Sequence, residues 1–377
     1  MSASELEPST LDARWMGVAL NLAKRGLGRV APNPAVGCVL VKDGHVVGRG
    51  WTQPGGRPHA ETEALMRAGE AARGATAYVT LEPCAHHGET PPCAEALIKA
   101  GVARVVTALR DPDPRVDGGG HDRLRRAGIE VVEGVRASEA EETNLGFLTR
   151  VREGRPAVTL KLATSLDGRI ATASGESKWI TGEQSRRLGH LLRAEHDAIM
   201  VGSGTALADD PELTCRVAGL EDRSPIRVVV DGKLALPATA RLVVGAREIE
   251  TVVMTGVAAE DARYDAFLKC GVSFIHMPDA TGDYVDLNSG FRALAARGIH
   301  SVLVEGGGGL ASALLDADLV DRVVMMRAGI VLGGDGRASI GGLAFEELAN
   351  APCFTRSSVA MLGSDVVESF RIKRRVA

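Results

Sequence analysis

The order of apolar and polar residues predicts strands that alternate with helices over the first part of the chain. Apolar residues first recur at helical spacing at Met16, Ala19, Leu20 and Ala23. Apolar runs predict strands at AVGCVLV (35–41), ATAYVTL (75–81) and ARVVTAL (103–109). Helices are predicted from His59 onward and over AEALIKAG (94–101), which ends in glycine. Strands that alternate with helices predict a sheet covered by helices.

A second series of strands and helices begins with AVTLKLATS (157–165). Further strands that run into glycine loops are predicted at AIMVGSG (198–204), IRVVVDG (226–232), TVVMTG (251–256) and SVLVEGGGG (301–309). Helical patterns lie between them, at residues 186–194, 259–270, 291–298 and 310–316. The segment 143–156 interrupts the apolar pattern with charged residues, a glycine and a proline. The sequence therefore predicts two α/β domains, residues 1–150 and 151–377.

Length, composition and charge agree with a two-domain globular enzyme and weigh against a nucleic acid as substrate. The chain has 377 residues, of which 45% are hydrophobic and 24% charged, enough for two domains of roughly 100–200 residues. A net charge of −4 and a pI of about 6.2 do not provide the broad positive field that binds phosphate backbones. Aromatic residues make up only 3%, so platforms for base stacking are scarce.

The sequence predicts a cytoplasmic protein that does not span a membrane. Acidic residues (Glu5, Glu7, Asp12) stand where a signal peptide would carry positive charge. No apolar run approaches the ~18 residues that span a bilayer. The cysteines are sparse and irregularly placed, which favours a reducing compartment over a disulfide framework. We expect small buried apolar side chains at Cys38, Cys215, Cys270 and Cys353.

A split cluster of His59, Glu61, Cys84 and Cys93 predicts a catalytic zinc site. One histidine and two cysteines can hold zinc and leave a fourth position for water, whereas structural zinc sites usually close with four protein ligands. The signature of zinc deaminases is H-x-E followed by P-C-x-x-C. Here the order is the same, but eight residues, AHHGETPP, separate the two cysteines instead of two. The alternatives are a structural zinc site or residues that never meet, but neither gives Glu61 a role.

The chemistry of such a site is hydrolytic. Zinc lowers the pKa of bound water towards ~7, and the resulting hydroxide can attack an amidine-like carbon of a heterocycle. Glu61 is placed to take the water proton, pass it to a ring nitrogen and later protonate the departing ammonia. His86 and His87 are predicted to be pocket or loop residues. Asn33 offers the donor and acceptor that suit a heterocycle edge, although Asn-Pro alone also indicates a turn.

Longer motifs resemble the bifunctional riboflavin-biosynthesis deaminase–reductases. Four motifs resemble the deaminase half of that family: PNPAVGCVLVKDG, PHAETEAL, YVTLEPCAHHGETPPCAEALI and ALRDPDPRVDGGG. Three further motifs resemble the reductase half: KLATSLDGRIATASGESKWITG, VGSGTALADDPELTCR and VEGGGGLASALL. These motifs stand in the expected order and extend over nearly the whole chain. The resemblance implies a cytidine-deaminase-like α/β/α domain followed by a dihydrofolate-reductase-like α/β domain.

The resemblance also implies two consecutive reactions on a small phosphorylated pyrimidine. The compound 2,5-diamino-6-(5-phosphoribosylamino)pyrimidin-4-one would be deaminated to 5-amino-6-(5-phosphoribosylamino)uracil, and NADPH would then reduce the ribosyl chain to a ribityl chain. Zinc would be held by His59, Cys84 and Cys93, with Glu61 as proton shuttle. The resemblance further implies a dimer or tetramer of identical chains.

The reductase contacts are expected at residues that the resemblance assigns. Cofactor contacts are implied for Ala163, Trp179, Thr205, Asp209, Gly232, Gly307, Gly308, Gly309, Leu310, Ala311, Ser312 and Ala313. Substrate contacts are implied for Ser177, Arg193, Leu213, Arg216 and Glu305. A strand, a glycine run and a helix at 301–316 allow phosphates to approach the backbone, but the glycines do not fit G-x-G-x-x-G, which favours a fold other than Rossmann. Guanidinium groups at 193 and 216 suit phosphate, and Lys161 or Asp209 could polarise or protonate the opened sugar imine.

The chain departs from the family at Glu89, where relatives usually have a basic residue, and Gly119 is a second position that is often basic. An anion at 89 would repel the substrate phosphate, so we expect Glu89→Lys to change the deaminase KM.

Two alternatives to the bifunctional enzyme remain open at this point. A nucleic-acid editing zinc deaminase with an accessory nucleotide-binding domain would need a basic face and aromatic stacking residues. A C-terminal half that binds nucleotide only for regulation would not oxidise NADPH.

Overall fold

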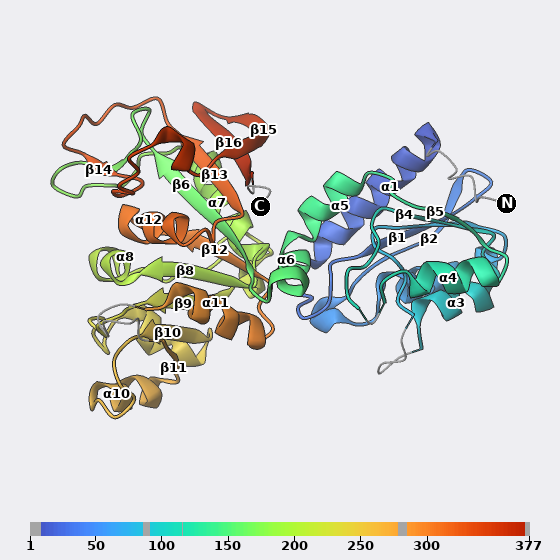
Figure 1. The fold of residues 1–377 in the computed structure, drawn as a ribbon, viewed down its shortest axis with the longest axis horizontal. Coiled ribbons are helices and arrows are strands. Elements are labelled where there is room, and N and C mark those ends of the chain that lie inside the picture. Colours follow the sequence, from blue (N-terminus) through green and yellow to red (C-terminus); the bar gives the residue numbers. More distant parts are fainter. Residues whose placement is uncertain (1–8, 86–90, 115, 278–284, 374–377) are drawn as a thin grey trace. The chain divides into compact units, whose positions relative to one another are not determined.

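The computed structural model describes residues 9–85, 91–114, 116–277 and 285–373. The chain divides into two compact units, Met1–Gly154 and Arg155–Ala377, and each unit is built on its own sheet (Figure 1).

The first unit contains a five-stranded sheet with the order β2-β1-β3-β4-β5. Strand β1 pairs antiparallel with β2 and β3, whereas β3, β4 and β5 are parallel. The strands are β1 (Gly37–Lys42), β2 (His45–Trp51), β3 (Thr76–Val79), β4 (Arg104–Thr107) and β5 (Glu130–Val132). The helices are α1 (Thr10–Ala23), α2 (Ala60–Ala68), α3 (Cys93–Ala100), α4 (Gly119–Arg126), α5 (Ala137–Thr143) and α6 (Leu145–Glu153).

Helices cover both faces of this sheet because successive strand residues point to opposite sides. Cys38 and Leu40 of β1 pack in a core with residues of α2, α3, α4 and α6. The alternate residues Val39 and Val41 pack in a second core with residues of α1 and α5. The first unit is therefore a three-layer α/β/α structure.

A glycine brings the start of α2 close to the sheet. A Cβ atom on Gly50 of β2 would lie 2.3 Å from the carbonyl oxygen of Ala60, so a larger residue would push the helix away. His59 is the N-cap residue of α2, and Glu61 lies in the first turn. The close approach therefore holds both side chains at a fixed place beside β2.

The second unit contains a nine-stranded sheet with the order β11-β10-β9-β8-β12-β6-β13-β16-β15. The strands from β11 to β13 are parallel, and β16 and β15 continue the sheet antiparallel. The strands are β6 (Ala157–Thr164), β8 (Ala198–Gly202), β9 (Ile226–Val230), β10 (Thr251–Thr255), β11 (Ser273–His276), β12 (Ser301–Glu305), β13 (Arg322–Arg327), β15 (Phe354–Leu362) and β16 (Asp365–Ile372). A separate two-stranded sheet joins β7 (Arg169–Ala171) to β14 (Arg337–Ala338).

Helices also cover both faces of the second sheet. They are α7 (Glu183–Ala194), α8 (Ser203–Asp209), α9 (Arg241–Val244), α10 (Arg263–Cys270), α11 (Leu287–Ala296) and α12 (Gly308–Asp316). One core contains Phe291 of α11 and Leu314 of α12, and the other contains Leu192 of α7, Leu242 of α9 and Phe267 of α10. Each strand predicted in this half from an apolar run is present, whereas β13, β15 and β16 lie beyond the last predicted element.

Two expectations from the sequence concern the burial of four cysteines and the absence of a helix that spans a membrane. Cys38 and Cys215 are buried as expected, but Cys270 is partly exposed and Cys353 is exposed. The expectation of burial is wrong for Cys353 because it lies on the surface segment that precedes β15. In the described part of the chain, no helix has the length and apolar character needed to cross a membrane.

Candidate active sites in the two units

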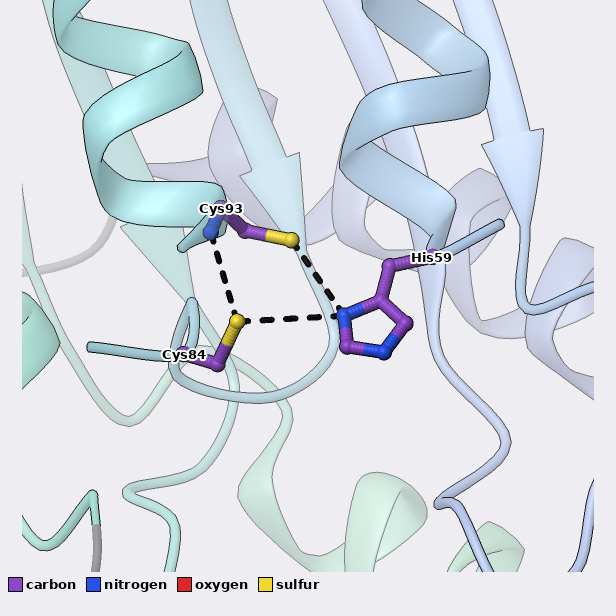
Figure 2. A group of neighbouring side chains, drawn as sticks. All are labelled: His59, Cys84 and Cys93. Carbon is purple, nitrogen blue, oxygen red and sulfur yellow. Dashed lines mark hydrogen bonds between the residues drawn. The ribbon is translucent and has the colours of Figure 1, made fainter. Parts of the chain in front are cut away.

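The candidate metal ligands converge in the first unit from three separate segments (Figure 2). His59 precedes α2, Cys84 lies in the loop after β3, and Cys93 is the first residue of α3. The His59 Nδ1 atom lies 3.8 Å from the Cys84 Sγ atom and 3.4 Å from the Cys93 Sγ atom. All ligand atoms lie within 4.8 Å of one another. Tetrahedral zinc would separate its nitrogen and sulfur ligands by about 3.5 Å, so the donor set and its spacing fit this ion.

The protein environment prepares a Cys84 thiolate. The pKa of Cys84 is lowered to about 4, first because of its hydrogen bond with the Cys93 side chain and further by His59 and the Cys93 backbone. The Cys93 N–H donates to the Cys84 Sγ atom at 3.3 Å. The hydrogen bond to Cys84 raises the pKa of His59, and the positive charge of Arg57 opposes that rise. Thiolate and neutral imidazole are the ligand forms that bind zinc. The lowered pKa of Cys84 therefore favours binding, whereas the raised pKa values of Cys93 and His59 mean that zinc must displace their protons.

Glu61 lies in the same pocket as this cluster and is almost completely buried. Burial raises the pKa of Glu61 to about 7, although the nearby His59 charge lowers it. A carboxyl group that is half protonated near neutral pH can both accept and donate a proton. The structure thus places Glu61 where a proton shuttle is expected.

Asn33 lines this pocket, as do four residues to which the sequence gave no individual role. The Asn33 Nδ2 atom donates to the Gly56 carbonyl oxygen at 2.7 Å. The additional charged lining residues are Arg57, Glu82, Asp111 and Asp113. Glu82, Asp111 and Asp113 belong to quoted motifs, whereas Arg57 stands one residue before the motif PHAETEAL; only the fold brings the four together. His86, His87 and Glu89 lie outside the described residues.

The buried carboxylate of Glu82 holds the loop after β4, which lines one side of the pocket, in place. Its oxygens accept hydrogen bonds from the backbone N–H groups of Asp111, Gly118, Gly120 and His121, at 2.9–3.2 Å. A Cβ atom on Gly120 would lie 1.9 Å from the Pro83 carbonyl oxygen. The glycine run 118–120 therefore allows the loop after β4 to close against the segment that carries Cys84.

Asp111 and Asp113 project from this fastened loop into the pocket lining. Asp111 accepts a hydrogen bond from the Asp113 N–H at 2.9 Å. Burial raises the pKa of Asp111 to about 6, and the neighbouring Asp113 and Glu82 charges add to the rise. The loop thus brings two more acidic groups to a pocket that already holds Glu61.

The second unit has a larger pocket at the carboxyl ends of its central parallel strands, which is where open α/β sheets bind ligands. It is lined by residues that begin α8 and α12 and by the ends of β8 and β12. The implied contacts that line it are Ala163, Ser177, Arg193, Thr205, Asp209, Leu213, Glu305, Gly307, Gly308, Gly309, Leu310 and Ala313. Lys161 lines the same pocket.

The other implied contacts lie outside this lining. Ala311 is buried in the core beneath α12, and the Ser312 hydroxyl donates to the Gly308 carbonyl oxygen at 2.8 Å. Trp179 is 68% exposed, and its ring lies 4.7 Å from the guanidinium carbon of Arg186. Arg216 is exposed, and Gly232 follows the end of β9.

The start of α12 lines the second pocket and packs closely against neighbouring backbone. Gly307 is the N-cap residue, and its N–H donates to the Thr205 Oγ1 atom at 3.0 Å. A Cβ atom on Gly308 would lie 2.7 Å from the Ala338 carbonyl oxygen. Glycine is therefore required for this packing, and the N–H groups of a helix start are in general suited to anions.

A largely but not fully buried ion-pair network, with side chains 14–17% exposed, forms the polar floor of the second pocket. The Arg193 Nε and Nη2 atoms donate to the two carboxylate oxygens of Glu305 at 2.8 and 3.0 Å. The Lys161 Nζ atom lies 3.6 Å from Glu305. Burial alone would raise the pKa of Glu305, but the charges of Lys161 and Arg193 outweigh it and lower the pKa to about 2. Because Arg193 is engaged by Glu305, a phosphate would have to compete for the guanidinium that the sequence suggested as a clamp.

Known protein families match both units. The model "Cytidine and deoxycytidylate deaminase zinc-binding region" matches residues 9–109, and "RibD C-terminal domain" matches residues 156–367. The riboflavin biosynthesis protein RibD of Escherichia coli is 46% identical over 366 residues, which cover 94% of this chain and 98% of that protein. The chain belongs to the RibD family. RibD of Aquifex aeolicus is 40% identical over 361 residues, which cover 96% of this chain and 98% of that protein.

Solved RibD structures share the whole architecture. Acinetobacter baumannii RibD has a TM-score of 0.85 at 40% identity, and the match covers 96% of this chain and 99% of that one. A Thermotoga maritima deaminase/reductase has the same TM-score at 38% identity and the same coverage.

RibD membership confirms the resemblance found in the sequence and the two fold classes that it implied. The first unit is a zinc deaminase domain, the second is a reductase domain, and the protein is a bifunctional enzyme of riboflavin biosynthesis. Membership over both units also decides against the nucleic-acid editing alternative.

Proposed function

We propose that the first unit converts 2,5-diamino-6-(5-phosphoribosylamino)pyrimidin-4-one to 5-amino-6-(5-phosphoribosylamino)uracil and ammonia by zinc-dependent hydrolysis. The Thermotoga relative is named a diaminohydroxyphosphoribosylaminopyrimidine deaminase/5-amino-6-(5-phosphoribosylamino)uracil reductase. The observation that carries the proposal is the convergence of His59, Cys84 and Cys93, with the buried Glu61 lining the same pocket as His59 and Cys84.

In this mechanism the protein groups hold the metal, orient the ring and move protons. His59, Cys84 and Cys93 would hold zinc, which supplies the activation of a water molecule for attack on the ring. Glu61 takes the water proton at its carboxylate and passes it to a ring nitrogen. It then takes the remaining proton of the hydroxyl group added to the ring carbon and gives it to the departing amino group, so that the carbonyl forms as ammonia leaves. Asn33, anchored through its amide nitrogen, binds the edge of the pyrimidine.

The second unit then reduces the ribosyl chain of that product to a ribityl chain. The glycine-bounded start of α12 fits the phosphates of NADPH, which supplies the hydride when bound. We assign cofactor contacts to the implied residues that line the pocket, together with Trp179 and Gly232. Lys161 polarises the opened sugar imine, and a proton is delivered to its nitrogen as the hydride reaches the carbon. Asp209 lines the same pocket and is the second candidate for this proton delivery.

We also propose that identical chains associate in the cytoplasm as a dimer through the edge strand β15. Residues 355–361 of this strand are exposed, and β15 ends the nine-stranded sheet. Val359 and Met361 are 59% and 64% exposed. An open edge with apolar side chains is suited to pairing with a second copy.

A coupled assay tests the two reactions separately. The zinc-loaded protein is given the diaminopyrimidine, first without NADPH and then with it. Ammonia release is expected in both cases, and NADPH oxidation only in the second. A protein that releases no ammonia contradicts the deaminase assignment. Ammonia release without NADPH oxidation contradicts the reductase assignment and supports a binding-only second unit.

A further inference from the structure

The first pocket presents mostly acidic groups to a substrate that carries a phosphate. Its described lining contains the carboxyl groups of Glu61, Glu82, Asp111 and Asp113. Glu82 is compensated by backbone N–H groups, but no such set of backbone donors surrounds the other three in the described contacts. A phosphate monoester carries up to two negative charges near neutral pH. A cation at this pocket would offset the repulsion between these carboxylates and the phosphate.

Arg57 is the only lysine or arginine among the described residues that line the pocket. It follows the short 3₁₀ helix Pro54–Gly56 and has an extended backbone, with φ −145° and ψ 149°. Its side chain is partly exposed, so the guanidinium can meet solvent-facing groups of a bound ligand. The preceding residue, Gly56, accepts the hydrogen bond from Asn33. The same backbone segment thus carries the cation and anchors the proposed pyrimidine contact.

We propose that Arg57 binds the phosphate group of the deaminase substrate in this chain. The inference rests on the proposed deaminase function. A planar guanidinium can hold two phosphate oxygens at once. Arg57 stands two positions before His59, and extended residues span about 3.3 Å each. The guanidinium therefore lies within reach of a ligand whose ring is at the metal site and whose phosphate is several bonds away.

The test compares the phosphorylated substrate with its dephosphorylated counterpart in the ammonia-release assay. For the phosphorylated substrate, Arg57→Gln is expected to raise KM about 10- to 100-fold, the usual effect of losing a charge-assisted contact. For the dephosphorylated substrate, the change in KM is expected to be much smaller. Arg57→Lys keeps the charge without the planar fork and is expected to lie between the wild type and Arg57→Gln.

Arg49→Gln is the matched control, because Arg49 is exposed on β2 and does not line the pocket. Zinc content and thermal melting of each variant establish that the fold and metal site are intact. Equal KM changes for both substrates, or no change for the phosphorylated one, would overturn the assignment of Arg57 while leaving the deaminase function standing. A wild-type protein that releases no ammonia from either substrate would overturn the proposed function and this inference with it.

Discussion

The two units each bury a glutamate in a pocket, yet their surroundings shift the two pKa values in opposite directions. Burial raises the pKa of Glu61 to about 7. Burial also opposes the charge of Glu305, but Lys161 and Arg193 lower its pKa to about 2. Burial of a carboxyl group therefore does not decide its protonation; the neighbouring cations do. Glu61 is suited to exchange protons, whereas Glu305 is a permanent anion that organises two cations.

The pockets also differ in the part of the chain from which they are built. The first relies on particular side chains, because the protein ligands of zinc are cysteine sulfur, histidine nitrogen and carboxylate oxygen atoms. The second relies largely on helix starts and glycine backbone at the carboxyl edge of a parallel sheet. A site made of reactive side chains can be recognised from the residue types in a sequence. A backbone segment that binds phosphate can be formed by many different sequences and is therefore harder to recognise.

Removing the proton shuttle should have the largest effect. We expect Glu61→Gln to lower the deaminase kcat by about 10²- to 10⁴-fold, the usual contribution of general acid–base catalysis. Zinc content should be retained, and NADPH oxidation with the deaminated substrate should not change. The measurement is ammonia release alongside NADPH oxidation, with the exposed Glu70→Gln as control. A variant that keeps most of its deaminase activity would mean that another group moves the protons.

Removing the permanent anion should act on stability rather than on proton transfer. Glu305→Gln leaves Arg193 and Lys161 without their charged partner. Breaking a fully buried pair costs about 3–5 kcal/mol, and a smaller cost is expected here because the three side chains are 14–17% exposed. We expect the melting temperature of the second unit to fall, with the exposed Glu346→Gln as control. An unchanged melting temperature would show that the two cations are stabilised by other groups.

The same carboxylate predicts the direction of an acid effect. The folded-state pKa of Glu305 is about 2, below its ordinary value of 4.5. Its stabilising contribution is therefore complete above pH 4.5 and is lost as the pH falls towards 2. As the pH falls over this range, the melting temperature of the wild type should decline more steeply than that of Glu305→Gln. Parallel curves would contradict the assignment.

The sequence predicted the zinc cluster well because its residues are chemically distinctive. It did not predict the role of Glu82, whose hydrogen-bond partners lie 29–39 residues away along the chain. It also could not tell which way α12 would turn its side chains. Because α12 begins at Gly308, Ala311 faces the core although the motif places it in the cofactor loop.

Weakening the hydrogen bonds that hold the loop after β4 should reduce deaminase activity less than removing the proton shuttle Glu61. Glu82→Gln replaces one acceptor oxygen by an N–H donor, so the carboxamide cannot accept all four backbone hydrogen bonds. We expect the loop with Asp111 to lose its fixed position and the deaminase KM to rise about tenfold, with a smaller fall in kcat. Zinc content separates this effect from damage to Cys84. A fall in kcat alone, with KM unchanged, would contradict a role in positioning the substrate-facing wall.

The smallest effect is expected at Glu89, which lies outside the described residues and between the two cysteines in sequence. A carboxylate near the substrate phosphate weakens binding by like-charge repulsion, and the surrounding water reduces the size of the effect. We expect Glu89→Lys to lower the deaminase KM for the phosphorylated substrate by a few-fold and to leave the dephosphorylated substrate unaffected. Lysine at 89 should also restore part of the affinity lost in Arg57→Gln, because either cation can meet the same phosphate. An unchanged KM in both backgrounds would show that residue 89 does not face the phosphate and that the acidic first pocket depends on other groups to bind its substrate.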